Sequence, residues 1–151
     1  MRSVLLAAAL VACGYQPGSF HYPEALVAGQ HATVGCLDLS IGIRQRTPRA
    51  AVIDYDFGNR CDHPSVVDLA AVRVIGRTAD GREVSLAAYD PNGELRALPL
   101  DGRSTGHEAI AYESEKSPVA QICIDAAAIA HADRQWMCFA APPARIAEVT
   151  P

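Results

Sequence analysis

The sequence predicts an all-β domain of antiparallel strands, arranged as a sandwich or a barrel. Apolar and polar residues alternate over residues 37–44 and 53–57, as in strands that bury one face. Asp80-Gly81 and Asn92-Gly93 lie between such runs, and these dipeptides favour tight hairpins. Turn residues recur roughly every ten positions, which is the spacing of short strands in all-β folds.

The other expected strands are shorter and cover residues 66–69, 72–75, 84–88, 95–100, 109–112, 120–124 and 135–140. Pro99 makes one of them an edge strand, because proline lacks the N–H that a central strand needs. Residues 101–106 are expected to form a loop. Near 125–131 we expect one short helical turn with Asp125 as its cap, since five alanine-rich residues are too few for an independent helix.

The N-terminus has the features of an export signal. Arg2 precedes an apolar run over residues 4–12, which is shorter than the ~20 residues needed to span a bilayer and ends in small residues. The sequence Leu10-Val11-Ala12-Cys13 resembles the lipobox of bacterial lipoprotein precursors. The resemblance implies cleavage before Cys13, a lipid on its sulfur and acylation of the new amine. A plain secretory signal that ends beside a cysteine is the alternative.

The same resemblance implies a location in the cell envelope. Family sorting patterns retain proteins at the inner membrane through an Asp after the lipidated cysteine, and Gly14 stands there instead. We therefore expect a lipid-anchored protein of the outer membrane. The expected layout is a signal peptide over 1–12, a lipidated N-terminus and tether over 13–30, a β-sandwich domain over 31–141 and a flexible tail over 142–151.

Charge narrows the range of partners. Without Arg2 the chain has 12 basic and 17 acidic residues, a net charge of −5. The arginines are scattered and Lys116 is the single lysine, so no basic stripe forms. Nucleic acid is therefore not an expected partner, and neither is the surface of anionic lipid.

The remaining cysteines are Cys36, Cys61, Cys123 and Cys138, an even number in a chain that leaves the cytoplasm. Two disulfides are the default in such a compartment. Three pairings are possible, and we favour Cys36 with Cys61 and Cys123 with Cys138, because each closes a short segment. The spacing lacks the paired C-x₂₋₄-C pattern of a structural zinc site, so no metal is expected.

Strand count and hairpin spacing resemble those of small immunoglobulin-like or fibronectin-III-like sandwiches of envelope lipoproteins. The resemblance implies an antiparallel β-sandwich. It includes no diagnostic motif, because Trp136 lies two residues before the last cysteine rather than between the cysteines.

Several groups of polar residues are candidate sites. Asp54 and Asp56 share one face of a strand, with Asp62 and Asp68 nearby in sequence, and alternation predicts a solvated face there. Ser104, His107 and Glu108 lie within five residues but without a nucleophile motif, so we expect a loop entering a strand. Single, scattered histidines are expected on the surface; they are His21, His31, His63, His107 and His131.

The function expected from these features is contact rather than catalysis. We expect a binding or accessory module with no cofactor, whose partner is an envelope protein and whose recognition loops are 59–65 and 101–107. An apolar patch around Trp136 to Phe139 would mark a partner site, although a core strand is the default. One alternative is a hydrolase or metal-dependent enzyme, which needs Asp54, Asp56 and His107 to converge in a pocket. The other is a purely structural protein.

Overall fold

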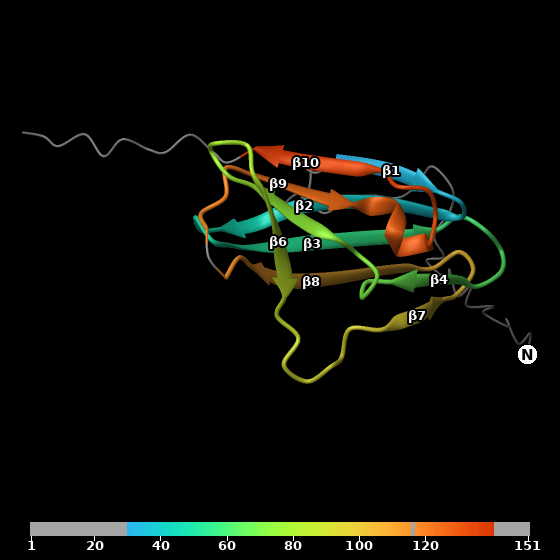
Figure 1. Cartoon of the computed structure of the whole chain (residues 1–151). Helices are drawn as coiled ribbons and strands as arrows, with labels where there is room; N and C mark the ends of the chain where they lie inside the picture. Colours follow the sequence, from blue (N-terminus) through green and yellow to red (C-terminus); the bar gives the residue numbers. More distant parts are fainter. Residues whose placement is uncertain (1–29, 116, 141–151) are drawn as a thin grey trace, which may run out of the picture.

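The computed structural model describes residues 30–115 and 117–140, and these form an all-β fold (Figure 1). The described strands are β1 (Gln30–Val34), β2 (Leu37–Arg46), β3 (Ala50–Asn59), β4 (Ser65–Asp68), β5 (Val74–Arg77), β6 (Glu83–Ala88), β7 (Ala97–Leu100), β8 (Thr105–Glu113), β9 (Gln121–Asp125) and β10 (Trp136–Ala140), and a 3₁₀ helix, η2, covers Ala126–Ala130.

Eight antiparallel strands form one sheet in the order β1-β2-β3-β8-β6-β5-β9-β10. The sheet curls until it is nearly closed into a barrel, so the edge strands β1 and β10 lie side by side (Figure 1). The amide of Gln30 in β1 donates to the carbonyl oxygen of Cys138 in β10 across 2.7 Å. Strands β4 and β7 form a separate two-stranded ribbon. The prediction of an all-β antiparallel domain is confirmed.

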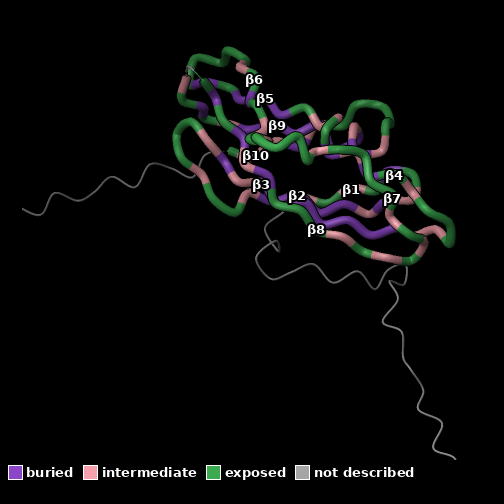
Figure 2. Tube along the Cα trace, turned by 90° about the horizontal axis from the view of Figure 1, so that it is seen from below, coloured by how far each residue is buried: buried purple, intermediate pink, exposed green. Residues whose placement is uncertain are grey.

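The core is built from the apolar face that alternation predicts. Ile53, Tyr55 and Phe57 of β3 point inward and meet Leu39 and Ile41 of β2. Figure 2 shows burial along most of β3 and the first part of β2, and β2 becomes exposed at Arg44 and Gln45. Removing these side chains from water supplies the main driving force for folding, roughly 25 cal/mol per Å² of apolar surface.

A polar pair lies inside this core. Tyr55 is fully buried, and its hydroxyl group donates to the Tyr112 hydroxyl oxygen across 3.0 Å. Burial raises the pKa of Tyr112 from 10.0 to about 12. Burial also raises the pKa of Tyr55 well above 10.0, and the neighbouring Tyr112 adds to that shift. Both groups are therefore held in the neutral form.

Most strand predictions match the structure, with four corrections. Asn92-Gly93 does not form the predicted hairpin, because β6 pairs with β5 and β8 whereas β7 pairs with β4. No strand was predicted at β1, because Ala32 and Val34 are the only apolar residues of Gln30–Val34. Strand β8 begins at Thr105, inside the segment 101–106 that was predicted as a loop. The helical turn is present at Ala126–Ala130, but Asp125 makes no side-chain cap. Its Oδ1 accepts instead from the backbone N–H of Gln135 at the start of the next strand.

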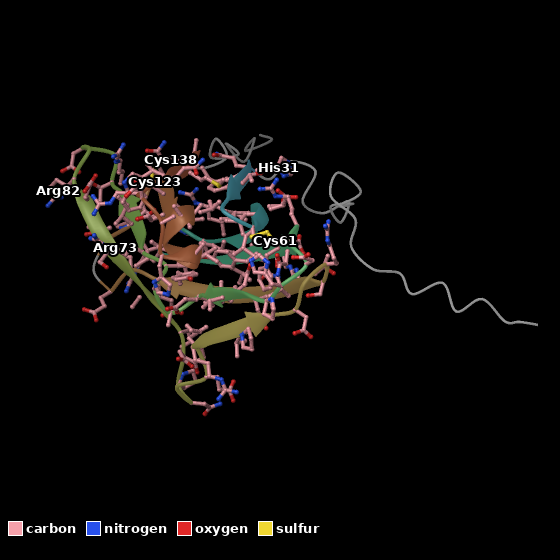
Figure 3. All side chains as sticks on the ribbon, turned by 90° about the vertical axis from the view of Figure 1, so that its right-hand side faces the viewer. His31, Cys61, Arg73, Arg82, Cys123 and Cys138 are labelled. Atoms are coloured by element: carbon pink, nitrogen blue, oxygen red, sulfur yellow. A yellow bond between two sulfur atoms is a disulfide. The ribbon has the colours of Figure 1, made fainter. Side chains whose placement is uncertain are left out.

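The disulfides have the pairing that the sequence favours. Cys36 is bonded to Cys61, and Cys123 is bonded to Cys138 (Figure 3). The second pair bridges directly opposed residues of β9 and β10. The first joins the β1–β2 hairpin to the loop after β3. Cys13, its lipobox, the tether and the tail lie outside the described residues.

The buried tyrosines predict a loss of stability in alkali. Unfolded tyrosines lose their protons near pH 10, whereas folded Tyr112 keeps its proton to about pH 12 and burial also raises the pKa of Tyr55, so stability falls as the pH rises from about 10 to 12. Urea unfolding at neutral pH and at steps between pH 10 and 12 measures the fall. Tyr112→Phe should cost about 1 kcal/mol at neutral pH and make the alkaline fall shallower. Tyr89→Phe, at an exposed tyrosine, is the control and should leave the fall unchanged. An equal fall in Tyr112→Phe would contradict the assignment.

Candidate functional site

Two carboxylates of β3 lie on the outer face of the sheet, yet they are buried. Asp54 is 1% exposed and Asp56 is 4% exposed. The prediction of a solvated face was therefore wrong. Alternation correctly places both side chains opposite Ile53, Tyr55 and Phe57, but neighbouring strands cover them. Buried carboxylates need partners, because desolvation of a charge is costly.

The register of three strands brings those partners together. Ser40 of β2, Asp56 of β3 and His107 of β8 are directly opposite one another. His107 Nδ1 lies 2.7 Å from Asp56 Oδ1. A carboxylate only accepts hydrogen bonds, so Nδ1 carries a proton and donates. The ring is thereby fixed against the face of β3.

Arg44 completes the network from β2. Its Nε donates to Asp54 Oδ2 across 2.9 Å, and its Nη2 lies 2.6 Å from Asp54 Oδ1. Nη2 also lies 3.3 Å from His107 Nε2. His107 Nε2 in turn lies 3.7 Å from Asp54 Oδ1. Asp54, Asp56 and His107 thus converge, but the enzyme alternative also requires a pocket around them, and each of the three is engaged by a neighbour.

Asp56 Oδ2 and the fully buried hydroxyl oxygen of Ser40 have no hydrogen-bond partner among the described residues, and Asp54 Oδ1 has only its contacts with Arg44 and His107. The contacts of this network hold the His107 ring in one orientation, while its side chain remains 44% exposed at the surface.

The side chains of Ser104 and Glu108 do not join the network around His107. The Ser104 hydroxyl group donates to the Asp101 carbonyl oxygen across 2.6 Å, which closes a turn. Glu108 alternates with His107 and lies on the other side of β8. The expectation of a loop that enters a strand is confirmed.

The described histidines lie at the surface, as expected. His63 contacts Asp62, and His131 Nε2 lies 3.2 Å from Asp68 Oδ2. His31 is exposed on β1 (Figure 3). His21 lies outside the described residues. These histidines come from different parts of the fold and do not gather into one ligand set.

The two loops predicted for recognition pack against each other at one end of the sheet. Asn59, fully buried at the end of β3, donates through Nδ2 to the carbonyl oxygens of His63, Leu100 and Asp101. The Arg103 N–H donates to the Cys61 carbonyl oxygen across 2.9 Å. A Cβ at Gly102 would lie 2.4 Å from the Asp62 backbone, so the contact needs glycine. The loops form one ordered surface.

Strand β8 has an open edge, which sequence reasoning missed. Its residues direct N–H and C=O groups alternately toward β3 and away from it. Tyr89 N–H donates to the Ala111 carbonyl oxygen, so Ala109, His107 and Thr105 also direct their backbone groups away from β3. On that side β6 pairs with β8 only at Tyr112 and Glu113. Within the described residues, no strand pairs with positions 105–109 there.

A groove of about 380 Å³ lies beside this edge. Residues 108–111 of β8 form one wall, and the segment between β6 and β7 forms the other, with Tyr89 and Leu98 exposed at its rim. Asp90 orders that segment, because its carboxylate accepts from the N–H groups of Glu94 and Leu95. The groove therefore combines unpaired backbone, apolar side chains and a fixed wall.

The Trp136 to Phe139 segment belongs to the core, as the default interpretation had it. Met137 is buried and Phe139 packs against the core. On the other face Trp136 is half-buried, with the guanidinium carbon of Arg134 5.9 Å from its ring centroid. This cation–π contact leaves no patch of large apolar residues on that strand.

Comparisons with known proteins give no family. No family model matches the sequence, and no curated protein matches it. The crystal structure of the yjhA protein from Bacillus subtilis is similar in part, with a TM-score of 0.45 and 9% identity over 69% of this chain and 83% of that chain. No functional conclusion follows from a similarity of this size. No helix in residues 30–115 or 117–140 has the length and apolar character needed to cross a bilayer.

The outer-face network predicts unequal effects at two arginines. Arg44→Met leaves the buried Asp54 carboxylate without its guanidinium, and the free energy of unfolding should fall by about 1–3 kcal/mol. This is less than for a fully buried pair, because the Arg44 side chain is 48% exposed. Arg77→Met breaks an exposed pair with Glu83 and is the control, with an expected loss of about 0–1 kcal/mol. Urea unfolding compares them, and equal losses would refute the network's role.

Proposed function

We propose that this protein is a lipid-anchored protein of the bacterial outer membrane that binds an extended segment of another envelope protein. The lipobox at Leu10 to Cys13 supports the anchor, and the two disulfides suit an oxidising compartment outside the cytoplasm. The immunoglobulin-like sandwich stays a prediction within the all-β class.

The observation that carries the binding proposal is the open edge of β8. An extended peptide adds to such an edge by pairing its own N–H and C=O groups with those of Thr105, His107 and Ala109. Alternate side chains of the peptide then enter the groove beside Tyr89 and Leu98. Natural proteins usually protect long open edges, so an unprotected one beside a groove favours a partner.

Charge at the groove selects the peptide further. Asp90, Glu94 and Glu108 line it together with a single cation, Arg96. The excess of carboxylates favours a segment with lysine or arginine among its groove-facing residues. The occupant we propose is therefore an extended, basic and partly apolar segment of a partner protein.

The anchor would assist such a weak contact. Acyl chains confine the domain to a layer near the membrane, and a tether of about seventeen residues gives it reach. Confinement raises its effective concentration toward other proteins in the same layer. A modest interface then suffices for association.

The enzyme alternative draws on the convergence of Asp54, Asp56 and His107. Their mutual engagement with Arg44 favours a stabilising network over a catalytic one. We therefore propose a module that is not a catalyst, and the structural-protein alternative differs from it by predicting no peptide at β8.

The anchor is tested by Cys13→Ala. The wild-type chain should sediment with membranes and have an acylated N-terminal Cys13 by mass spectrometry. The variant should move to the soluble fraction, because nothing else in the proposal holds it to lipid. A native N-terminus that is uncut and unmodified would contradict the anchor.

The binding edge is tested by Ala109→Pro with Ala109→Val as the matched control. Proline removes the N–H that faces the open edge while leaving the pairing with β3 intact, whereas valine keeps the N–H. The probe is a displayed library of short linear peptides. We expect the wild type and Ala109→Val to enrich basic, alternating sequences that slow amide exchange at residues 105–109, and Ala109→Pro to lose at least tenfold in affinity. No enrichment, or equal binding by Ala109→Pro, would overturn the proposal.

A further inference from the structure

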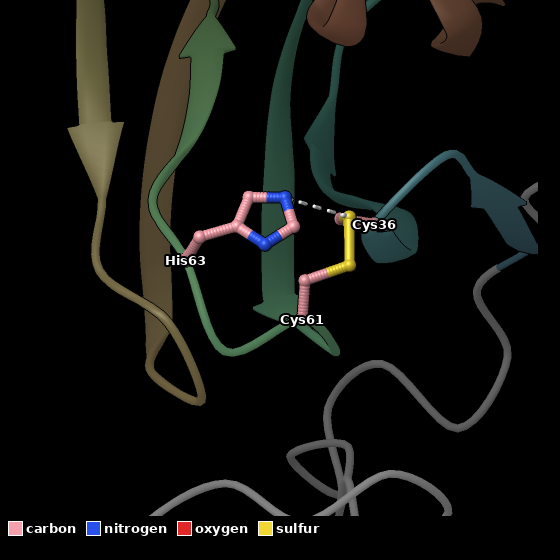
Figure 4. A group of neighbouring side chains, drawn as sticks. All are labelled: Cys36, Cys61 and His63. Carbon is pink, nitrogen blue, oxygen red and sulfur yellow. Dashed lines mark hydrogen bonds between the residues drawn. A yellow bond between two sulfur atoms is a disulfide. The ribbon is translucent and has the colours of Figure 1, made fainter.

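Cys36, Cys61 and His63 lie together at the loop end of the sheet (Figure 4). The His63 Nε2 atom lies 3.9 Å from Cys36 Sγ. One ligand atom from each of the three residues lies within 4.8 Å of the others. Two sulfur atoms and an imidazole nitrogen at this spacing are the donor set that thiophilic cations prefer.

A carboxylate orients the histidine. His63 Nδ1 lies 3.2 Å from Asp62 Oδ1, so Nδ1 is occupied and Nε2 is turned toward the sulfur atoms. Histidines that ligate metals almost always donate their second nitrogen to a carboxylate, carbonyl oxygen or water. Asp62 is thus in the position of such a supporting group.

The two cysteines are also held by contacts that do not involve sulfur. The Arg60 N–H donates to the Cys36 carbonyl oxygen across 2.7 Å. The Cys61 N–H donates to Asn59 Oδ1 across 3.0 Å, and the Cys61 carbonyl oxygen accepts from Arg103. Opening the disulfide therefore leaves both cysteine backbones in place.

The two disulfides differ in access. Cys36 and Cys61 are both half-buried, and the His63 side chain is 67% exposed. In the other disulfide Cys123 is 1% exposed. A soluble reductant therefore reaches the Cys36–Cys61 bond more readily than the Cys123–Cys138 bond, in which Cys123 is buried.

We propose that reduction of the Cys36–Cys61 disulfide opens a binding site for a thiophilic cation of the Zn²⁺ type, with Cys36 Sγ, Cys61 Sγ and His63 Nε2 as ligands. A dithiol supplies two electrons and two protons, becomes a disulfide and leaves two thiols on the protein. Metal binding then releases those two thiol protons, because thiolates are the ligands. The exposed side of His63 leaves a fourth position for water.

The geometry accommodates the ion. Tetrahedral zinc has Zn–S distances of about 2.3 Å and Zn–N distances of about 2.0–2.1 Å, so its ligand atoms lie roughly 3.3–3.8 Å apart. Cys36 occupies a hairpin turn beside Gly35, whose φ of +56° suits a two-residue loop, and Cys61 follows the end of β3. Both are on turns, where a side-chain rotation separates the sulfur atoms without disturbing a strand.

The site is tested by zinc competition against a chromophoric chelator on the full chain, with Cys13→Ala in every protein to remove an extra thiol. The phosphine-reduced protein should bind one Zn²⁺, and the oxidised protein none at this site. His63→Ala should weaken binding at least tenfold, and Asp62→Asn by about tenfold. His131→Ala is the matched control, since His131 is an exposed histidine beside a different aspartate, and should bind as tightly as the wild type.

Cobalt provides a second readout, because thiolate-to-Co²⁺ charge-transfer absorption reports sulfur ligation directly. Circular dichroism checks that each reduced variant keeps its strands, and Asp62→Asn changes only an exposed side chain. The proposal is overturned if the reduced protein holds no zinc, if the oxidised protein holds it equally, or if His63→Ala binds as tightly as the wild type. Neither membrane anchoring nor peptide binding enters these measurements.

Discussion

Strand β3 is buried on both faces, and the arrangement around it depends on that constraint. One face supplies Ile53, Tyr55 and Phe57 to the core, and the other carries two carboxylates. A carboxylate excluded from water must be paired or neutralised. The sheet therefore needs a cation on β2 and a donor on β8, and Arg44 and His107 meet that need. The register of β2, β3 and β8 satisfies the apolar and the polar face together.

The last residue of β3 fixes the two loops that meet at this end of the sheet. Asn59 follows directly on the buried run, and its side chain bonds to both loops that meet there. An amide has donors and an acceptor, so one residue fixes several backbone groups that would otherwise be unsatisfied. The position of Cys61, and hence of the disulfide and His63, follows from where β3 ends.

The sequence predicted the strands better than it predicted their surroundings. Period-two alternation identifies which side chains share a face, so the positions of β2 and β3 were predicted well. It does not say what covers that face, and for this reason Asp54 and Asp56 were assigned to solvent. The covering groups, Arg44 and His107, are brought in by register, and register is a long-range property.

The misses have physical causes as well. Strand β1 has only Ala32 and Val34 on its inward face, which is too little apolar character to stand out from a tether. The Gly35-Cys36 pair was a signal for the β1–β2 hairpin, because glycine is favoured at the first position of a two-residue hairpin loop. The open edge of β8 depends on how far β6 runs beside it, and no local pattern encodes that length. The cysteine pairing could be predicted from the sequence because both disulfides close short segments between neighbouring elements.

His107 connects the network to the proposed binding edge. Its side chain bonds to Asp56 on the outer face, while its backbone N–H and C=O groups point to the open side of β8. Holding the ring against β3 restrains the backbone of the same residue. A strand edge that is already ordered loses less conformational entropy when a peptide pairs with it. Burial of the two carboxylates thus has a consequence beyond stability, because it pre-organises the part of β8 to which an extended partner would bind.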